Sequence, residues 1–240
     1  MILLMVRPIL KKGAESADGR KAGSALASKN PTRRRSGVHG QVAKDAYQLR
    51  IIGGQWRGRR LNFPALEAIR PSPDRVRETL FNWLQPHIVG ASCLDLFAGS
   101  GALGLEALSR GAAHVCFVDR EAQIGRYLRD TLQRLECAQA SVHVEEAGRF
   151  LQRTARPFEI VFLDPPFDSA VLPEACSLLA QGWLAPQAWV YIECPADMPL
   201  LLPPSWQMHR SRRAGQVGYH LLQTGLPRTG RMSNPREVMP

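Results

Sequence analysis

The sequence predicts an α/β protein built around a mostly parallel sheet with helices on both of its faces. From Ser92 onward, short apolar runs alternate with segments of helical periodicity, as in repeated strand–helix–strand units. Two later strand-like segments, joined through Ala214-Gly215, break this rhythm and predict an antiparallel hairpin. The length of 240 residues and an apolar content of 45% allow one such domain with small additions.

A small β-hairpin is expected before this sheet, over residues 49–63 (LRIIGGQWRGRRLNF). Gly53-Gly54 can form a bulge or a turn, and Gly58 lies among basic residues where the second strand begins. With the helix that follows it, the hairpin is expected to form an N-terminal unit over residues 49–90. A larger domain over residues 91–225 then contains the sheet.

The sequence RPSPDRVRETLFNWL, residues 70–84, predicts the helix of this N-terminal unit. Ser72 is expected to cap the helix, Pro73 suits its first position, and Asp74 suits the positive end of the helix dipole. Apolar residues then recur on one face as far as Leu84, where we expect the helix to end.

The remaining elements follow from the same patterns. Expected strands cover residues 92–99, 114–119, 141–147, 159–166, 188–194, 206–213 and 216–224. Expected helices cover residues 101–111, 122–135, 148–154 and 170–183.

Both ends of the chain are expected to be disordered. Residues 1–48 carry a net charge of +7 and show no sustained period, which predicts a disordered basic extension; a misassigned start codon and a transit peptide are the alternatives. From Leu226 onward Pro, Gly, Arg and Ser dominate, which predicts a disordered tail over residues 226–240.

Basic residues are unevenly distributed along the chain. The net charge is +5 over residues 49–77, −7 over residues 78–209 and +5 over residues 210–240. An acidic body with basic ends favours a polyanionic partner, with improved solubility as the alternative explanation.

Composition also excludes several classes of protein. The five scattered cysteines are typical of buried free thiols in a reducing cytosol. The six histidines show no ligand spacing, so we expect no metal site. No apolar run approaches the roughly 18 residues that a membrane span needs, so we expect no membrane partner.

A glycine-rich loop predicts a nucleoside-binding site. The sequence LDLFAGSGALGLEAL places Gly99, Gly101 and Gly104 in a G-x-G-x-x-G run between a strand and a helix. Such a loop turns tightly and lets a ligand approach the backbone beside the first helix amides. Asp119 ends the next strand, where a carboxylate can accept hydrogen bonds from ribose hydroxyls.

The acidic residues around this loop favour S-adenosylmethionine (SAM) over a dinucleotide, because SAM has no phosphate and carries cationic groups. Asp95 lies four residues before Gly99, and this D-x-x-x-G-x-G arrangement resembles the first motif of class I SAM-dependent methyltransferases. The resemblance assigns Asp95 and Phe97 to the cofactor site. It also assigns Glu146, after the third strand, to the adenine amino group, with Glu145 as the alternative.

The sequence IVFLDPPFD, residues 160–168, ends a buried strand with a carboxylate and two prolines. Ligands of an open parallel sheet lie outside the carboxyl ends of its strands, and DPPF there resembles the motif of methyltransferases that act on exocyclic base amines. The side chain of Asp164 and the carbonyl of Pro165 can each accept one amine hydrogen. Both bonds strengthen as the nitrogen becomes tetrahedral and positive. Phe167 can stack on the base.

Several longer blocks resemble the RsmD family: RIIGGQWRGRRL, RPSPDRVRETLFNWL, CLDLFAGSGALGLEALSRGA, FVDR, VFLDPPF and AGQVGYHLLQ. Together they extend over residues 49–223. The resemblance implies a seven-stranded Rossmann-like fold and SAM-dependent methylation of the N2 amine of one guanine, guanine 966 in the family, of bacterial 16S ribosomal RNA. It also implies action on the assembled small ribosomal subunit in the cytoplasm. We expect a monomer.

Arginine-rich segments supply the expected RNA-binding surface. Guanidinium groups neutralise phosphates and an indole ring offers a stacking face. The candidates are Arg50, Trp56, Arg57, Arg59, Arg60, Arg70, Arg75 and Arg77. We expect about half of them to contact RNA and the others to pair with acids such as Asp74 or Glu78. A second basic patch is expected near the last hairpin, from Arg210, Arg212 and Arg213.

Three other functions are compatible with parts of this pattern. A DNA or other RNA base-amine methyltransferase shares the DPPF chemistry, although a DNA enzyme normally needs a recognition domain for which this chain has no room. A non-catalytic RNA-binding assembly factor that retains SAM as a ligand is the second. A nicotinamide-dependent dehydrogenase is the third, and it lacks a recognisable acid for hydride transfer.

Overall fold

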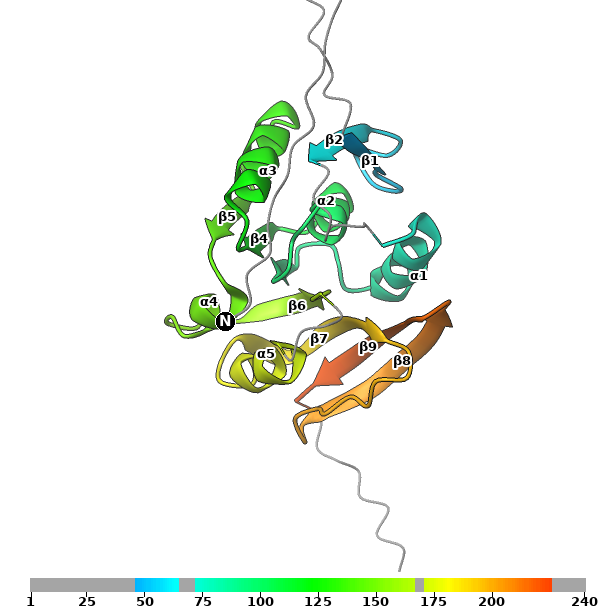
Figure 1. The fold of residues 1–240 in the computed structure, drawn as a ribbon, viewed down its shortest axis with the longest axis vertical. Coiled ribbons are helices and arrows are strands. Elements are labelled where there is room, and N and C mark those ends of the chain that lie inside the picture. The colour runs from blue at the N-terminus through cyan, green and yellow to red at the C-terminus, as the bar shows by residue number, and fades with distance from the viewer. Residues whose placement is uncertain (1–45, 65–71, 167–170, 226–240) are drawn as a thin grey trace, which may run out of the picture. The chain divides into compact units, whose positions relative to one another are not determined.

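The computed structural model describes residues 46–64, 72–166 and 171–225. Within these residues, seven strands form one sheet in the order β5-β4-β3-β6-β7-β9-β8 (Figure 1). The parallel strands are β3 (Ser92–Asp95), β4 (His114–Asp119), β5 (Ala140–Val144), β6 (Phe158–Leu163) and β7 (Leu184–Pro195). The antiparallel strands are β8 (Trp206–Ala214) and β9 (Val217–Thr224). The predicted fold class is confirmed.

Helices cover both faces of this sheet, as the sequence predicts (Figure 1). Side chains alternate along β6: Ile160 and Phe162 pack into one apolar core, while Val161 and Leu163 pack into the other. The first core includes α1 (Asp74–Leu84), α2 (Ala102–Ser109) and α3 (Ala122–Arg134). The second includes α4 (Ala147–Leu151) and α5 (Val171–Leu179).

Several expected strands end earlier than the apolar pattern suggested. β3 ends at Asp95, β5 at Val144 and β6 at Leu163, and the residues that follow form loops at the carboxyl edge of the sheet. β7 begins at Leu184, before the expected start, because Leu184 pairs with Phe158 ahead of a register shift. The glycine loop and the two prolines therefore belong to connections rather than to strands.

The predicted N-terminal hairpin is present, with β1 (Ala46–Arg50) antiparallel to β2 (Arg60–Pro64). It begins earlier than expected, so residues 46–48 belong to the hairpin and not to the extension. Tyr47 lies opposite Phe63, with ring centroids 5.7 Å apart, and this aromatic pair lengthens the ladder. Residues 1–45 and 226–240, where disorder was expected, lie outside the described residues.

The start of α1 differs from the prediction at Ser72. Pro73 takes the capping position and Asp74 is the first helical residue. The hydroxyl of Ser72 donates instead to Glu193 on β7, with an oxygen–oxygen distance of 2.5 Å. The buried carboxylate needs a hydrogen-bond donor, whereas the exposed amides at the start of the helix can bond to water. The serine hydroxyl therefore points inward.

The carboxylate of Glu106 on α2 fixes the hairpin to the sheet domain. It is fully buried and accepts hydrogen bonds from the backbone N–H groups of Ile52 and Gly53, both at 2.8 Å. Arg110, the C-cap residue of α2, donates to it at 2.7 Å. The buried charge therefore has partners from the hairpin loop and from its own helix.

Arg77 of α1 completes this cluster. Its side chain is 1% exposed, its Nη1 lies 3.6 Å from Glu106 Oε2, and its Nη2 lies 2.6 Å from Asp74 Oδ1. It also donates to the backbone carbonyl of Arg50, at 2.8 Å. One guanidinium thus links α1, α2 and the hairpin.

The five cysteines are free thiols; four are buried and Cys137 is half-buried. Among the helices of the described residues, none combines the length and the apolar character needed to span a bilayer.

Replacing Arg77 by Met should lower the free energy of unfolding by about 3 kcal/mol, because Glu106 then loses a buried cationic partner. Urea denaturation followed by circular dichroism measures this value. Arg75→Met, an exposed arginine on the same helix, is the matched control and should change the free energy by less than about 0.5 kcal/mol. Equal effects of the two substitutions would contradict a structural role for Arg77.

Candidate active site

The glycine loop turns sharply between β3 and α2. Gly99 and Gly101 have φ angles of +48° and +73°, in the left-handed region that favours glycine. A Cβ atom at Gly101 would lie 2.6 Å from a methyl group of Leu128. The loop therefore needs glycine for its backbone conformation and, at Gly101, also for space.

The third glycine of the run allows α2 to approach the sheet closely. A Cβ atom at Gly104 would collide with the ring of Phe117 on β4, and it would lie 3.0 Å from Asp95 Oδ2. The same close approach lets the backbone N–H of Gly104 donate to Asp95 Oδ2 at 2.9 Å.

Asp95 ends β3 beneath the glycine loop. Its side chain is buried, with 2% exposed. Burial raises the pKa of Asp95 to about 7; the Gly104 hydrogen bond opposes this shift, and the nearby charge of Asp119 adds to it. A cationic neighbour would stabilise the charged form of this carboxyl group and so lower its pKa.

Asp119 contacts the glycine loop. Asp119 Oδ2 accepts the backbone N–H of Gly99, and Oδ1 accepts the backbone N–H of Glu121, both at 2.8 Å. Burial raises the pKa of the Asp119 carboxyl group, and these two bonds oppose the shift. Each oxygen keeps a lone pair for a further donor such as a hydroxyl.

The two neighbouring glutamates after β5 differ in their surroundings. Glu145 forms an ion pair with Arg153 at 2.8 Å, and its side chain is 10% exposed. Glu146 is exposed at the start of α4. Glu146 is therefore the freer of the two. Phe97 is half-buried and packs against the core that includes α4 and α5.

Asp164 and the two prolines lie beside the glycine loop. β6 pairs with β3, Asp95 is opposite Phe162, and the backbone N–H of Leu96 donates to the carbonyl of Phe162 at 3.2 Å. Asp164 follows β6 at the same edge. Burial raises the pKa of Asp164 well above its usual range, and the charges of Glu193 and Asp95 raise it further. Pro165 is buried; Phe167 lies outside the described residues.

The sequence did not reveal that Glu193 belongs to this site. Glu193 is 4% exposed and lies in an otherwise apolar stretch of β7. Its Oε1 accepts the hydroxyls of Ser72, at 2.5 Å, and of Tyr191, at 2.8 Å. The available signal was a single acidic residue near the carboxyl end of an apolar strand. Asp164 occupies the equivalent position after the neighbouring strand, so this acid could have been assigned to the same site.

Two residues expected to bind RNA are part of the core. Trp56 is 6% exposed, and its backbone N–H donates to Ser109 Oγ at 3.0 Å. Arg77 is held by Asp74 and Glu106 as described above. Burial of both side chains argues against the prediction that they contact RNA.

The other described arginines of this set are exposed and lie on the hairpin and at the start of α1, with Arg50 opposite Arg60 across the hairpin. Arg50 and Arg75 lie near the start of α1, where Arg50 Nε is 3.9 Å from Asp74 Oδ2. Arg57 and Arg59 belong to the hairpin loop, which bonds to the C-terminal turn of α2 through Ser109. Arg60 begins β2. Arg70 lies outside the described residues. On β8, Arg210, Arg212 and Arg213 are exposed.

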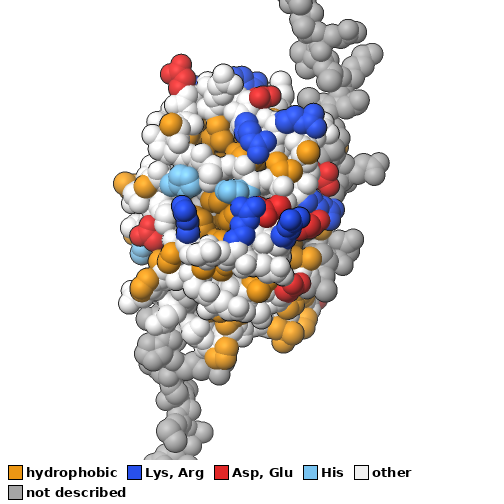
Figure 2. Space-filling view, turned by 90° about the vertical axis from the view of Figure 1, so that its left-hand side faces the viewer, with side chains coloured by type: hydrophobic (Ala, Val, Ile, Leu, Met, Phe, Trp, Pro, Cys, Tyr) orange, Lys and Arg blue, Asp and Glu red, His pale blue; other side chains and the backbone are white. Residues whose placement is uncertain are grey.

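The face that carries α3, β5 and α4 shows basic and acidic side chains interspersed rather than separated (Figure 2). Arg153 pairs with Glu145 and Arg120 with Glu121 in this part of the molecule. This face therefore does not present a continuous basic surface.

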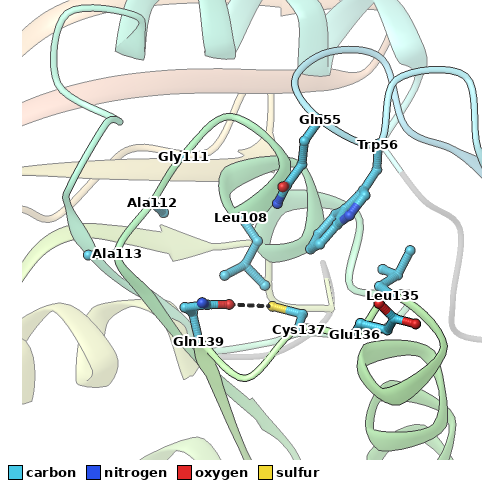
Figure 3. A pocket seen from close by; sticks show the side chains of 10 residues that line it. All are labelled: Gln55, Trp56, Leu108, Gly111, Ala112, Ala113, Leu135, Glu136, Cys137 and Gln139. Carbon is cyan, nitrogen blue, oxygen red and sulfur yellow. Dashed lines mark hydrogen bonds between the residues drawn. The ribbon is translucent and has the colours of Figure 1, made fainter.

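A cavity of about 310 Å³ lies beside the hairpin loop (Figure 3). Gln55 and Trp56 of the hairpin loop lie above it, and Leu108 of α2 lines it. Its other lining residues immediately precede β4 and β5: Gly111, Ala112, Ala113, Leu135, Glu136, Cys137 and Gln139. The cavity is thus at the amino ends of these strands, opposite the edge where the glycine loop and Asp164 meet.

No group of three or more His, Cys, Asp or Glu side chains in the described ranges is arranged to bind a metal ion. The strand order, the helices on both faces and the glycine loop after the first parallel strand define a Rossmann-like fold of the class I methyltransferase type. The chain belongs to the RsmD family, whose model is described as "Conserved hypothetical protein 95" and matches residues 49–223.

Relatives of known name share most of this region. Ribosomal RNA small subunit methyltransferase D of Escherichia coli (strain K12) is 49% identical, over 73% of this chain and 90% of the relative. The protein of the same name from Haemophilus influenzae is 44% identical, over 73% of this chain and 94% of the relative. A solved structure of yhhF from Escherichia coli has a TM-score of 0.69 and 48% identity, and the match covers 74% of this chain and 98% of that chain.

Replacing Asp95 by Asn should make the protein less sensitive to pH. The pKa of Asp95 rises on folding from 3.8 to about 7, so the wild type loses stability as the pH rises through this range and levels off above it. Asn does not titrate. The variant should match the wild type near pH 4 and exceed it by about 1–3 kcal/mol at pH 8. Urea titrations of the ligand-free protein at several pH values measure the difference.

Asp130→Asn, at an exposed carboxylate of α3, is the control and should leave the pH dependence unchanged. If the curves of unfolding free energy against pH were parallel for Asp95→Asn and the wild type, they would contradict the raised pKa of Asp95.

Proposed function

We propose that the protein transfers the methyl group of SAM to the N2 amine of a guanine, guanine 966 in the family, in the 16S RNA of the assembled small ribosomal subunit. Curated relatives that carry the name ribosomal RNA small subunit methyltransferase D support the reaction and the class of RNA. The free cysteines are consistent with action in the bacterial cytoplasm.

The residues around the glycine loop fit SAM. When bound, SAM supplies a methyl group on a sulfonium centre that is activated toward nucleophiles. Asp95 offers a carboxylate for the cationic methionine end, and Asp119 offers acceptors for the ribose hydroxyls. Glu146, exposed at the start of α4, is the better candidate for the adenine amino group because Glu145 is paired with Arg153. Phe97 supplies an apolar contact beside the loop.

Asp164 and Pro165 are suited to activate a base amine. The lone pair of such an amine is delocalised into the ring, so the nitrogen is a weak nucleophile. The carboxylate of Asp164 accepts one amine hydrogen and the carbonyl of Pro165 accepts the other. Both bonds strengthen as the nitrogen becomes positive, so they act mainly on the transition state. Phe167 remains the proposed stacking platform for the flipped base.

One observation carries this proposal: β6 and β3 are neighbours, with Asp95 opposite Phe162. This pairing brings the Asp-Pro-Pro turn next to the glycine loop at the carboxyl edge of the sheet. A methyl donor held by the loop and an amine held by Asp164 would then lie at the same edge of the sheet, and this positioning would contribute much of the rate.

Replacing Asp164 by Ala should lower the rate of methyl transfer about 10²–10³-fold, because the amine loses a polar acceptor in the transition state. Tritium transfer from labelled SAM to small ribosomal subunits that lack the modification measures the rate. RNA binding, measured by filter retention, should stay within about 2-fold of the wild type. Methylation that survives this substitution would overturn the mechanism.

The choice of substrate is tested in the same assay with three acceptors: small subunits, free 16S RNA and duplex DNA. Label should enter the small subunits, and digestion of the product should yield N2-methylguanosine. Label in duplex DNA alone would instead support a DNA base-amine methyltransferase.

The exposed arginines of the hairpin are proposed to contact RNA phosphates. The double substitution Arg59→Ala with Arg60→Ala should weaken binding to the small subunit. It should also reduce the slope of log K against log salt by about 1 per lost contact. Arg156→Ala, an exposed arginine in the loop before β6, is the control and should leave the slope unchanged. An unaltered slope in the double variant would remove these two arginines from the RNA surface.

A further inference from the structure

Glu193 of β7 lies next to Asp164, although the methyl transfer described above does not use it. β6 and β7 are parallel, and Leu163 lies opposite Ile192. The next residue along each chain segment is Asp164 after Leu163 and Glu193 after Ile192, so these two residues lie at the same level. Glu193 is 4% exposed. A carboxylate buried to this extent is costly unless it is hydrogen-bonded.

Two hydroxyl groups bond to Glu193, and one of them also reaches Asp164. Ser72 Oγ and the Tyr191 hydroxyl both donate to Glu193 Oε1, at 2.5 and 2.8 Å. Ser72 interacts with the carboxyl group of Asp164 as well, which lowers the pKa of that group. The serine hydroxyl has a single hydrogen, so it donates to one of these two carboxyl groups at a time.

Glu193 also borders the space beside the proposed amine site. A small cavity of about 10 Å³ is lined by Pro165, Pro166 and Glu193. The second carboxyl group is therefore close to the backbone that carries the proposed acceptors, rather than in a distant part of the core.

We propose that Glu193 is a positioning residue for the methyl transfer, which together with Ser72 holds and polarises the Asp164 carboxylate that receives the amine hydrogen. This inference rests on the proposed function. In the reaction the nitrogen lone pair forms the new N–C bond, and sulfur keeps the electron pair of the broken S–C bond. The amine then gives one proton to Asp164, and the N–H pair returns to nitrogen as its lone pair.

The effect of Glu193 on Asp164 is electrostatic. A second negative charge makes Asp164 hold a proton more strongly, and an acceptor works best when its pKa is near the working pH. Burial is the largest cause of the raised pKa of Asp164; Glu193 is next, Asp95 of β3 adds to it, and Ser72 opposes it. Tyr191 of β7 and Tyr219 of β9 are the other titratable groups in this cluster.

Two substitutions should shift the pH dependence in opposite directions. Glu193→Gln keeps the shape and the acceptor oxygen but removes the charge, so the pKa of Asp164 falls. In the profile of single-turnover rate against pH, the acid limb then moves to lower pH and the plateau rate falls about 10-fold. The KM for the small subunit should stay unchanged. Ser72→Ala removes a hydrogen bond that lowers the pKa of Asp164, so its acid limb moves to higher pH.

The carboxyl group is also observable without a substrate. A ¹³C NMR titration of the free protein, with the Asp164 signal assigned from Asp164→Asn, should show the same opposite shifts. Glu159→Gln is the matched control, because Glu159 lies on β6 and its Oε2 likewise accepts a serine hydroxyl, that of Ser92 at 3.2 Å. It should change neither the rate nor the titration.

The possible outcomes separate this inference from the proposed function. A wild-type protein that transfers no label to small-subunit RNA contradicts the proposed function, while the NMR titration still tests the effect of Glu193. An active wild type whose Glu193→Gln variant keeps the rate and the pH profile contradicts the inference. Shifts of Glu193→Gln and Ser72→Ala in the same direction also contradict it. Should Glu193→Gln fail to fold, the rate profile and titration of Ser72→Ala decide, and an unshifted profile counts against the proposal.

Discussion

The buried carboxylate of Glu106 joins the hairpin, α1 and α2. It accepts two backbone N–H groups of the hairpin loop, and Arg77 and Arg110 balance its charge. α2 is also the helix that begins at the glycine loop, so the same helix is joined to the glycine loop at one end and holds the hairpin at the other. The orientation of the exposed hairpin arginines relative to the proposed reaction centre is therefore fixed by one ionic cluster rather than by a flexible linker.

The proposed reaction centre brings together three carboxyl groups whose pKa values are all raised mainly by burial: Asp95, Asp164 and Glu193. Folding alone does not favour such a cluster, because each charge loses solvation and repels the others. The arrangement is suited to a cationic ligand and to a reaction that releases a proton. The stability of the ligand-free protein and the chemistry of the site thus make opposite demands on the same residues.

The sequence predicted the sheet well because alternation of strands and helices leaves few possible topologies. The glycine loop, Asp119 and Asp164 were predicted for the same reason: each lies where a strand ends. Long-range contacts of side chains were not predictable in this way. Trp56 and Arg77 have residue types common on RNA-binding surfaces, yet burial against α2 depends on segments far along the chain. Glu193 was missed because its role requires the register of β6 and β7 and the path of Ser72.

The hydrogen bonds from the hairpin loop to Glu106 connect residues that are separated by 54 and 53 positions in the sequence. A two-stranded hairpin alone is marginally stable in water, and its anchoring carboxylate is synthesised only with α2. During translation the hairpin therefore leaves the ribosome well before the helix that secures it, with its apolar side chains uncovered. Its folding must wait for the first strand and helix of the sheet domain, so the N-terminal unit is made first but completed late.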